Sequence, residues 1–283
     1  MRKLFFQLGL CSALVTLFSC GGSKETEEKT KDTTVAVSKK DSTAELKEFK
    51  FFMILANVPS PAKEVVEIQK SGMKYNASLL NPKENESKYS ENTKVCLNYG
   101  VYASDLAYCA SFKDNPDLMS YFLLNRKMAD KAGALSVFEE IIKQENFESH
   151  TKNVDSLELI LDKAYMATEK FCEDQHKLDI AVKILIGSWI EGQHLTLSTI
   201  NGLEQNAKNK KLFEKVWENF LHLRNINDLL SEYENHPELN DLKTQLKAYA
   251  EIYNDAHGVE DMKKDRISKL YEAMSKIRAS VIS

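Results

Sequence analysis

The amino-acid sequence predicts an all-α protein, a multi-helix antiparallel bundle of roughly eight to ten helices. Glycine and proline number only 10 and 5 among 283 residues. This is less than half of what average composition gives, and it disfavours a turn-rich sandwich or barrel. No proline occurs between Pro116 and Pro237. Apolar residues in that stretch recur every three or four positions, which is the period of helices packed on one face.

The start of the chain carries the pattern of an export signal that ends in a lipid-attachment site. Arg2 and Lys3 precede an uncharged apolar stretch, Leu4–Leu17, which is too short to cross a bilayer. The following Phe-Ser-Cys-Gly-Gly, with the leucine before it, resembles a bacterial lipobox. We expect residues 1–19 to be a cleaved signal peptide and Cys20 to carry several acyl chains, palmitate among them, which make the anchor durable. An ordinary signal peptide with a chance cysteine, or an uncleaved anchor, stays open.

Residues 20–44 are expected to comprise the lipidated cysteine and a flexible tether, because small and charged residues dominate there and aromatic residues are absent. The acidic cluster at 25–28 resembles the surface-export signals of some Gram-negative lipoproteins, and a merely soluble tether explains it equally well. We therefore expect an outer membrane lipoprotein of a Gram-negative bacterium, with the periplasmic or surface face left open. The chain has 38 basic and 42 acidic side chains, a balance that disfavours nucleic acid as a partner.

A single helical domain is expected over residues 45–283, and it could divide near residues 202–208. Two prolines separate the helical segment Leu46–Val58 from the next helix. Residues 95–101 alternate like a strand, but residues 95–109 also fit a helical stripe, and we expect a helix because no partner strand is evident. Further helices are expected at about Asn115–Gly133, Leu135–Ile142 and Val154–Phe171.

The segment Leu178–Ile190 is apolar on nearly every side, which predicts a helix at the centre of the bundle. Long amphipathic helices are expected beyond Gly202. The last of them has a regular apolar stripe, formed by Ile267, Leu270, Met274, Ile277 and Val281. Their alternating steps of three and four residues resemble a coiled-coil seam, but the short length favours one helix of an ordinary bundle.

Three cysteines remain once Cys11 in the signal and Cys20 are set aside: Cys96, Cys109 and Cys172. Their spacing matches no zinc or redox motif. On one helix Cys96 and Cys109 would be about 20 Å apart, too far for a disulfide. Either could meet Cys172, although buried free thiols are the favoured interpretation.

Polar residues inside apolar helices form the candidate site. Asn98, Tyr102 and Asp105 lie in one apolar run, and Trp189 and Glu191 lie in another. These five side chains could line an inter-helix pocket for a small polar ligand, or they could brace the core through hydrogen bonds, and we favour bracing. A binder would show a cavity where the two acids meet, whereas a brace would show them paired with Lys, Arg or backbone groups.

Two Glu-x-x-His pairs, Glu173 with His176 and Glu191 with His194, resemble half of a di-iron bundle motif. They flank one predicted helix about 27 Å apart, so they cannot share a metal ion. No phosphate-binding loop, dinucleotide fingerprint or nucleophile elbow is present. We therefore expect no catalytic residue, no metal and no cofactor.

Several segments together resemble an uncharacterised family of all-helical bacterial envelope lipoproteins. They are Asn57–Pro61, Ser71–Asn76, Leu79–Pro82, Leu97–Tyr108 and Gly187–Glu191. The resemblance covers about residues 50–200 and implies an exported, all-helical lipoprotein. It implies no activity, ligand or catalytic residue.

These observations predict a lipid-anchored cell-envelope protein that is not an enzyme. It would attach to the membrane through Cys20 and act as a binding or scaffolding module for a protein partner in the envelope. The alternative is a small-molecule binder with its pocket near Asp105 and Glu191.

Overall fold

The structure is a computed structural model that describes residues 49, 53–54, 57–232 and 236–283. The predicted signal peptide, the lipidation of Cys20 and the tether over 20–44 lie outside the described residues, as does most of the segment Leu46–Val58. The described residues form helices and connecting loops without a strand, which confirms the all-α prediction. These helices belong to one compact unit, residues 43–283.

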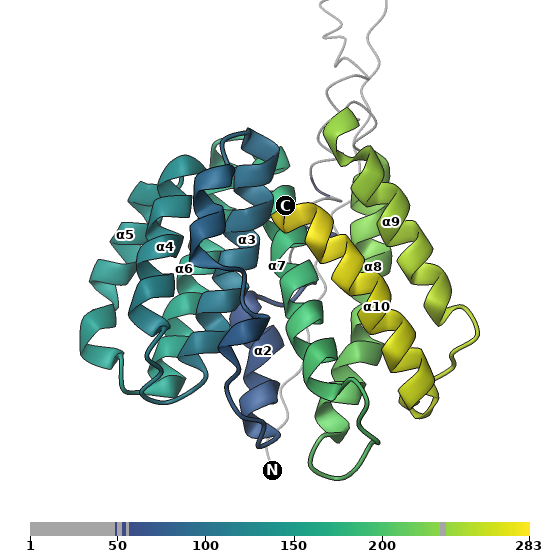
Figure 1. The fold of residues 1–283 in the computed structure, drawn as a ribbon. Coiled ribbons are helices and arrows are strands. Elements are labelled where there is room, and N and C mark those ends of the chain that lie inside the picture. The colour runs from purple at the N-terminus through teal and green to yellow at the C-terminus, as the bar shows by residue number, and fades with distance from the viewer. Residues whose placement is uncertain (1–48, 50–52, 55–56, 233–235) are drawn as a thin grey trace, which may run out of the picture. The chain divides into compact units, whose positions relative to one another are not determined.

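Two long helices, α3 (Asn92–Ala110) and α7 (Leu178–Ile200), occupy the middle of this unit (Figure 1). The helix expected over residues 95–109 is therefore confirmed. Every residue of α7 from Ala181 to Leu197 is buried, which confirms its predicted central position. The two helices approach closely because a glycine of α7 faces the backbone of α3. A Cβ at Gly187 would overlap the carbonyl group of Leu97.

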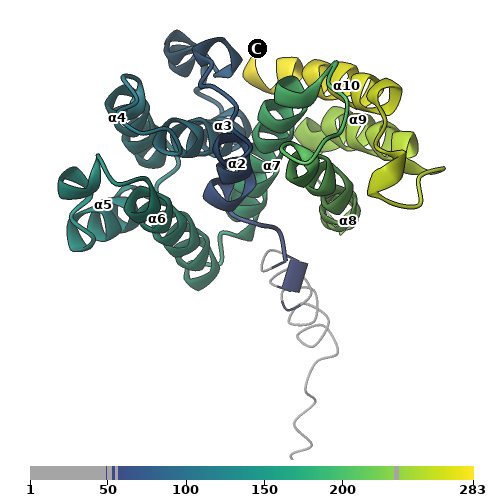
Figure 2. The same cartoon turned by 90° about the horizontal axis from the view of Figure 1, so that it is seen from below.

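The other helices flank this pair on two sides. Helices α4 (Leu118–Lys131), α5 (Leu135–Gln144) and α6 (Val154–Asp174) lie on one side, and α8 (Lys210–Glu232), α9 (Asn240–Ala250) and α10 (Lys264–Ile282) lie on the other (Figure 2). Helix α2 (Pro61–Lys70) contacts α3, α6, α7 and α8. Short 3₁₀ turns occur at Ala77–Leu79, Lys83–Lys88, Phe147–His150, Pro237–Leu239, Glu251–Tyr253 and Val259–Asp261.

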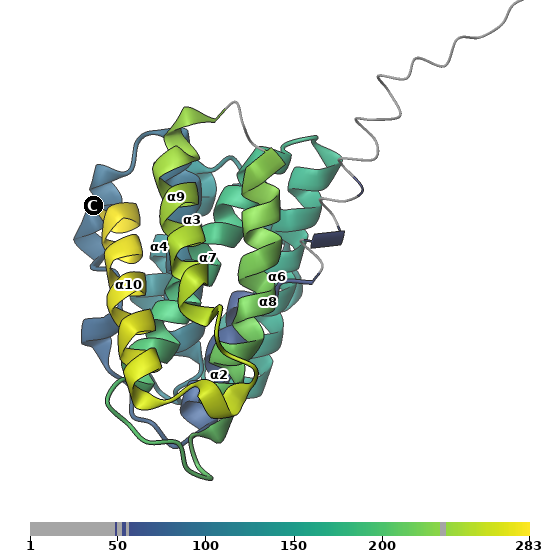
Figure 3. The same ribbon diagram turned by 90° about the vertical axis from the view of Figure 1, so that its right-hand side faces the viewer.

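Helix α10 closes the face seen in Figure 3, where it lies beside α9. Its buried residues are the five of the regular apolar stripe predicted from the sequence. The helix packs against α3, α7 and α9 of its own chain. The stripe therefore belongs to an ordinary bundle helix.

Cys96, Cys109 and Cys172 are all buried and free. Burial raises the pKa of the Cys96 thiol to about 12 and that of the Cys172 thiol to about 11. These groups stay protonated near neutral pH and are poor nucleophiles. All three cysteines are therefore buried free thiols, which is the interpretation that the sequence favoured.

Candidate functional site

Asp105 of α3 and Glu191 of α7 are fully buried in the centre of the bundle. Arg278 of α10 holds Glu191 with two hydrogen bonds, from Nε to Oε2 at 2.6 Å and from Nη2 to Oε1 at 2.8 Å. The same Nη2 donates to the carbonyl oxygen of Leu79 at 3.0 Å. This bidentate geometry gives a buried carboxylate the partner that it requires.

Asn81 lies in a buried loop before α3 and is the centre of the surrounding hydrogen bonds. Its backbone N–H donates to Asp105 Oδ2 at 3.1 Å, and its Nδ2 donates to the hydroxyl of Tyr89 at 3.1 Å. The hydroxyl of Tyr121 donates to the carbonyl oxygen of Asn81 at 2.9 Å. Because buried backbone groups need partners, this network allows the loop to cross the core.

Asn98 and Tyr102 of α3 belong to the same network. Asn98 Nδ2 donates to the carbonyl oxygens of Lys94 at 2.9 Å and Val281 at 3.0 Å. The hydroxyl of Tyr102 donates to the carbonyl oxygen of Pro82 at 2.9 Å. Four of the five predicted site residues therefore come together, and they pair with an arginine, side chains and backbone groups, while Asp105 Oδ1 has no hydrogen-bond partner.

Burial and two charged neighbours shift the pKa of Asp105. Burial, followed by the negative charge of Glu191, raises the pKa of Asp105 well above its ordinary value, and Arg278 acts in the opposite direction. An ion pair between Arg278 and Glu191 beside a neutral Asp105 is the arrangement that these shifts favour.

Trp189 does not join this cluster. Its Nε1 donates to Asn219 Oδ1 of α8 at 3.2 Å, and Asn219 Nδ2 donates to the buried Glu64 of α2 at 3.1 Å. Trp189 and Glu191 are two residues apart, which is about 200° around a helix, so they point to opposite sides. Trp189 therefore lies apart from the other four residues, and the alternative of a pocket lined by all five does not hold for it.

In the second Glu-x-x-His pair, both residues are engaged by other groups. Glu191 is held by Arg278, and His194 Nδ1 lies 3.4 Å from the hydroxyl of Ser198. Burial lowers the pKa of His194 to about 4. In the described part of the chain no three His, Cys, Asp or Glu side chains are placed to hold a metal ion. Among the described helices, none is both long enough and apolar enough to cross a membrane.

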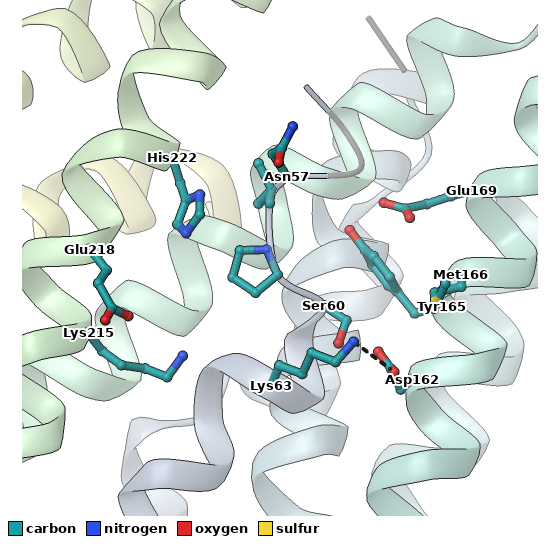
Figure 4. Close-up of a pocket in the computed structure, with 12 residues that line it drawn as sticks. Asn57, Ser60, Lys63, Asp162, Tyr165, Met166, Glu169, Lys215, Glu218 and His222 are labelled. Carbon is teal, nitrogen blue, oxygen red and sulfur yellow. Dashed lines mark ion pairs between the residues drawn. The ribbon is translucent and has the colours of Figure 1, made fainter. Parts of the chain in front are cut away.

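A pocket of about 410 Å³ lies between α2, α6 and α8, away from the predicted residues (Figure 4). Its lining comprises Asn57, Val58, Pro59, Ser60, Lys63, Asp162, Tyr165, Met166, Glu169, Lys215, Glu218 and His222. Residues 57–60 and the start of α2 form its floor, and α6 and α8 supply its walls. The volume is within the range of small-molecule sites.

Several polar atoms in this pocket lack hydrogen-bond partners among the described residues. Ser60 is only 6% exposed, yet its Oγ makes no hydrogen bond. Asp162 pairs with Lys63 through Oδ2 at 3.1 Å, while its buried Oδ1 is unpartnered. The buried Nδ1 of His222 is also unpartnered. Nine other buried side-chain atoms of the described residues, Asp105 Oδ1 among them, also lack a hydrogen-bond partner. These three are distinguished by lining one cavity, where a bound ligand or water would supply their hydrogen bonds.

Burial shifts the two titratable groups at the upper part of the pocket in Figure 4 toward their neutral forms. It raises the pKa of Glu169 to about 8, with a smaller contribution from the charge of Asp162 and an opposing hydrogen bond with Tyr165. Burial, followed by the charge of Lys215, lowers the pKa of His222. Near neutral pH the pocket therefore offers a protonated carboxyl and a neutral imidazole beside charged lysines.

Sequence reasoning missed this pocket, although a signal was present. Polar residues recur on one side of α6 at 162, 165 and 169, and on one side of α8 at 215, 218 and 222. Such rows are typical of solvated helix faces. They become a site only because α2 holds the two helices apart.

No family model, curated protein or solved structure matches this chain.

Proposed function

We propose that this protein is a lipid-anchored, non-enzymatic binding module of the Gram-negative outer membrane, and that its ligand site is the pocket between α2, α6 and α8. One observation carries the assignment of the site. Three helices converge on a cavity of about 410 Å³ whose buried Ser60 Oγ, Asp162 Oδ1 and His222 Nδ1 have no hydrogen-bond partner among the described residues. A polar ligand would supply those partners.

The lipid anchor rests on the lipobox-like sequence around Cys20. We expect Cys20→Ala to abolish labelling by radioactive palmitate and to release the protein from the membrane fraction, because no acyl chain would then hold it. Cys11→Ala, which changes another cysteine of the signal region, is the matched control and should keep both properties. Equal labelling of the two variants would contradict the anchor.

The binding role is tested by native mass spectrometry of the full chain, purified in detergent from the envelope of its own host. We expect an adduct in the small-molecule mass range that disappears with Lys215→Met, which removes a charge from the pocket. The alternative site near Asp105 and Glu191 predicts that Asp105→Asn removes the adduct instead. A bare protein mass would contradict small-molecule binding and direct attention to cross-linked protein partners in the envelope.

A further inference from the structure

The two walls of the pocket differ in charge. The α6 wall presents Asp162 and Glu169, whereas the α8 wall presents Lys215 and His222 and has Glu218 exposed at its rim (Figure 4). In the empty pocket Asp162 is paired with Lys63 and Glu169 is protonated, so Lys215 is the uncompensated charge and Glu169 is the acid that a ligand cation would ionise. A ligand that carries both charges would find a partner on each side.

The positive end is formed by Lys215 and the start of α2. Lys215 makes no ion pair within 4.0 Å of a described residue, although its charge acts on the pKa of the buried Glu64, and Figure 4 shows its side chain directed into the pocket. Ser60 is the N-cap of α2, but its side chain makes no capping hydrogen bond. The first amide groups of a helix lack intrahelical acceptors and attract anions. A carboxylate here would accept hydrogen bonds from Lys215 and from the unpartnered Ser60 Oγ.

The negative end is formed by Glu169. Asp162 on the same wall is already paired with Lys63 at 3.1 Å. Glu169 has no cationic partner among the described residues and contacts Tyr165 through a hydrogen bond. An ammonium group beside Glu169 would favour the ionised carboxylate and pair with it.

We infer that the pocket binds a small zwitterion, a free amino acid or a short peptide, whose carboxylate is held by Lys215 and Ser60 and whose ammonium group is held by Glu169. This inference rests on the proposed function, which places the ligand site in this pocket. A purely anionic ligand would leave Glu169 without a cationic partner, and a purely cationic one would leave Lys215 without an anionic partner and be repelled by it. Only a ligand with both charges matches both walls.

Binding of an ammonium group beside Glu169 should release a proton from its carboxyl group. Tyr165 and Asp162 on its own helix act on the pKa of Glu169. The other titratable groups that line the pocket are Lys63 of α2 and Lys215, Glu218 and His222 of α8. With a pKa of about 8, Glu169 is mostly protonated at neutral pH in the empty pocket. An ammonium group would favour the carboxylate, so each binding event should release close to one proton.

The experiment is isothermal titration calorimetry on the full chain in detergent. The probes are the common amino acids and alanyl-alanine, and the best binder is compared with its N-acetylated and C-amidated forms. We expect each blocked form to bind at least about tenfold more weakly, since each loses a charged hydrogen-bonding group. Titrations of the best binder in two buffers of different ionisation enthalpy should show the released proton.

Four variants test whether Lys215 and Glu169 hold the ligand. Lys215→Met and Glu169→Gln should each weaken binding at least about tenfold, and Glu169→Gln should abolish the proton release. Lys211→Met and Glu173→Gln are matched controls on the same helices; their side chains pair with Glu214 and Lys170 outside the pocket, so affinity should not change. Equal effects of the two sets of variants would overturn the inference.

The remaining outcomes separate the ligand class from the binding role. If no zwitterion binds but native mass spectrometry shows an adduct that Lys215→Met removes, the ligand class is wrong and the proposed function stands. If a bound zwitterion keeps its affinity when either end is blocked, the ligand class is likewise wrong. If neither a titration nor an adduct shows binding, the inference and the proposed function both fail.

Discussion

Asp105 has no contact with solvent, and burial together with the charge of Glu191 raises its pKa well above the ordinary value. A group whose pKa is raised by folding stabilises the folded protein fully below its unfolded pKa, and this contribution is lost as the pH rises through the folded pKa. Asp105 therefore makes the protein less stable as the pH rises above about 4. At the residue scale, its environment converts an acid into a neutral hydrogen-bonding group.

Asp105→Asn tests this description. The amide keeps an acceptor for the backbone N–H of Asn81 but cannot ionise, so the variant should match the wild type near pH 4 and be more stable at about pH 8. Urea unfolding at both pH values measures the difference. Asp105→Ala should instead lower the free energy of unfolding by about 1–3 kcal/mol, because it leaves that N–H without a partner. An Asn variant with the same deficit at both pH values would contradict the raised pKa.

At the scale of the helices, the closest contact is the crossing of α3 and α7. Glycine occurs on both helices at the crossing, where Gly100 faces the backbone of Ile184 and Gly187 faces that of Leu97. A glycine inside a helix costs roughly 0.5–1 kcal/mol relative to alanine. The close packing of two largely buried helices offsets this cost, since their side chains are removed from water along most of both elements.

Gly187→Ala should force the two helices apart, because the new methyl group would overlap the carbonyl group of Leu97. We expect the free energy of unfolding to fall by about 3 kcal/mol, as in other overpacked cores. Gly192→Ala is the matched control on α7: its Cβ would meet only the Glu64 side chain, at 3.3 Å. Thermal and urea unfolding should show a change within about 1 kcal/mol for the control. Equal losses in the two variants would contradict the close crossing.

At the scale of the whole unit, the polar cluster ties the end of the chain to the centre of the fold. Arg278 joins α10 to Glu191 of α7 and to the loop at Leu79. The hydroxyl of Tyr89 also donates to the carbonyl oxygen of Ile282 at 3.1 Å. Such a network specifies which face of α10 packs inward, a choice that apolar contacts alone define less sharply.

Arg278→Met should lower the free energy of unfolding by about 3–5 kcal/mol, because it leaves the buried carboxylate of Glu191 unpaired. Combining it with Glu191→Gln should recover part of the loss, since no charge then remains without a partner. Arg266→Met is the control on the same helix; Arg266 pairs with the largely exposed Asp255, so a smaller loss is expected. Additive effects of Arg278→Met and Glu191→Gln would contradict direct coupling between the two residues.

The sequence by itself determined the helical class, the central position of α7 and the buried stripe of α10. These features follow from hydrophobic periodicity, which depends only on near neighbours in the chain. It also predicted that Asp105 and Glu191 would be buried and in need of partners. It could not name Arg278, which lies 87 residues beyond Glu191.

Only the tertiary structure decided which residues meet. It separated Trp189 from Glu191, since the two point to opposite sides of α7, and it brought together the floor at Ser60 with Glu169 of α6 and Lys215 of α8. Each of those segments alone has the pattern of a solvated surface or a helix start. Which helix faces meet depends on packing between segments far apart in the chain, and local periodicity carries no information about that choice.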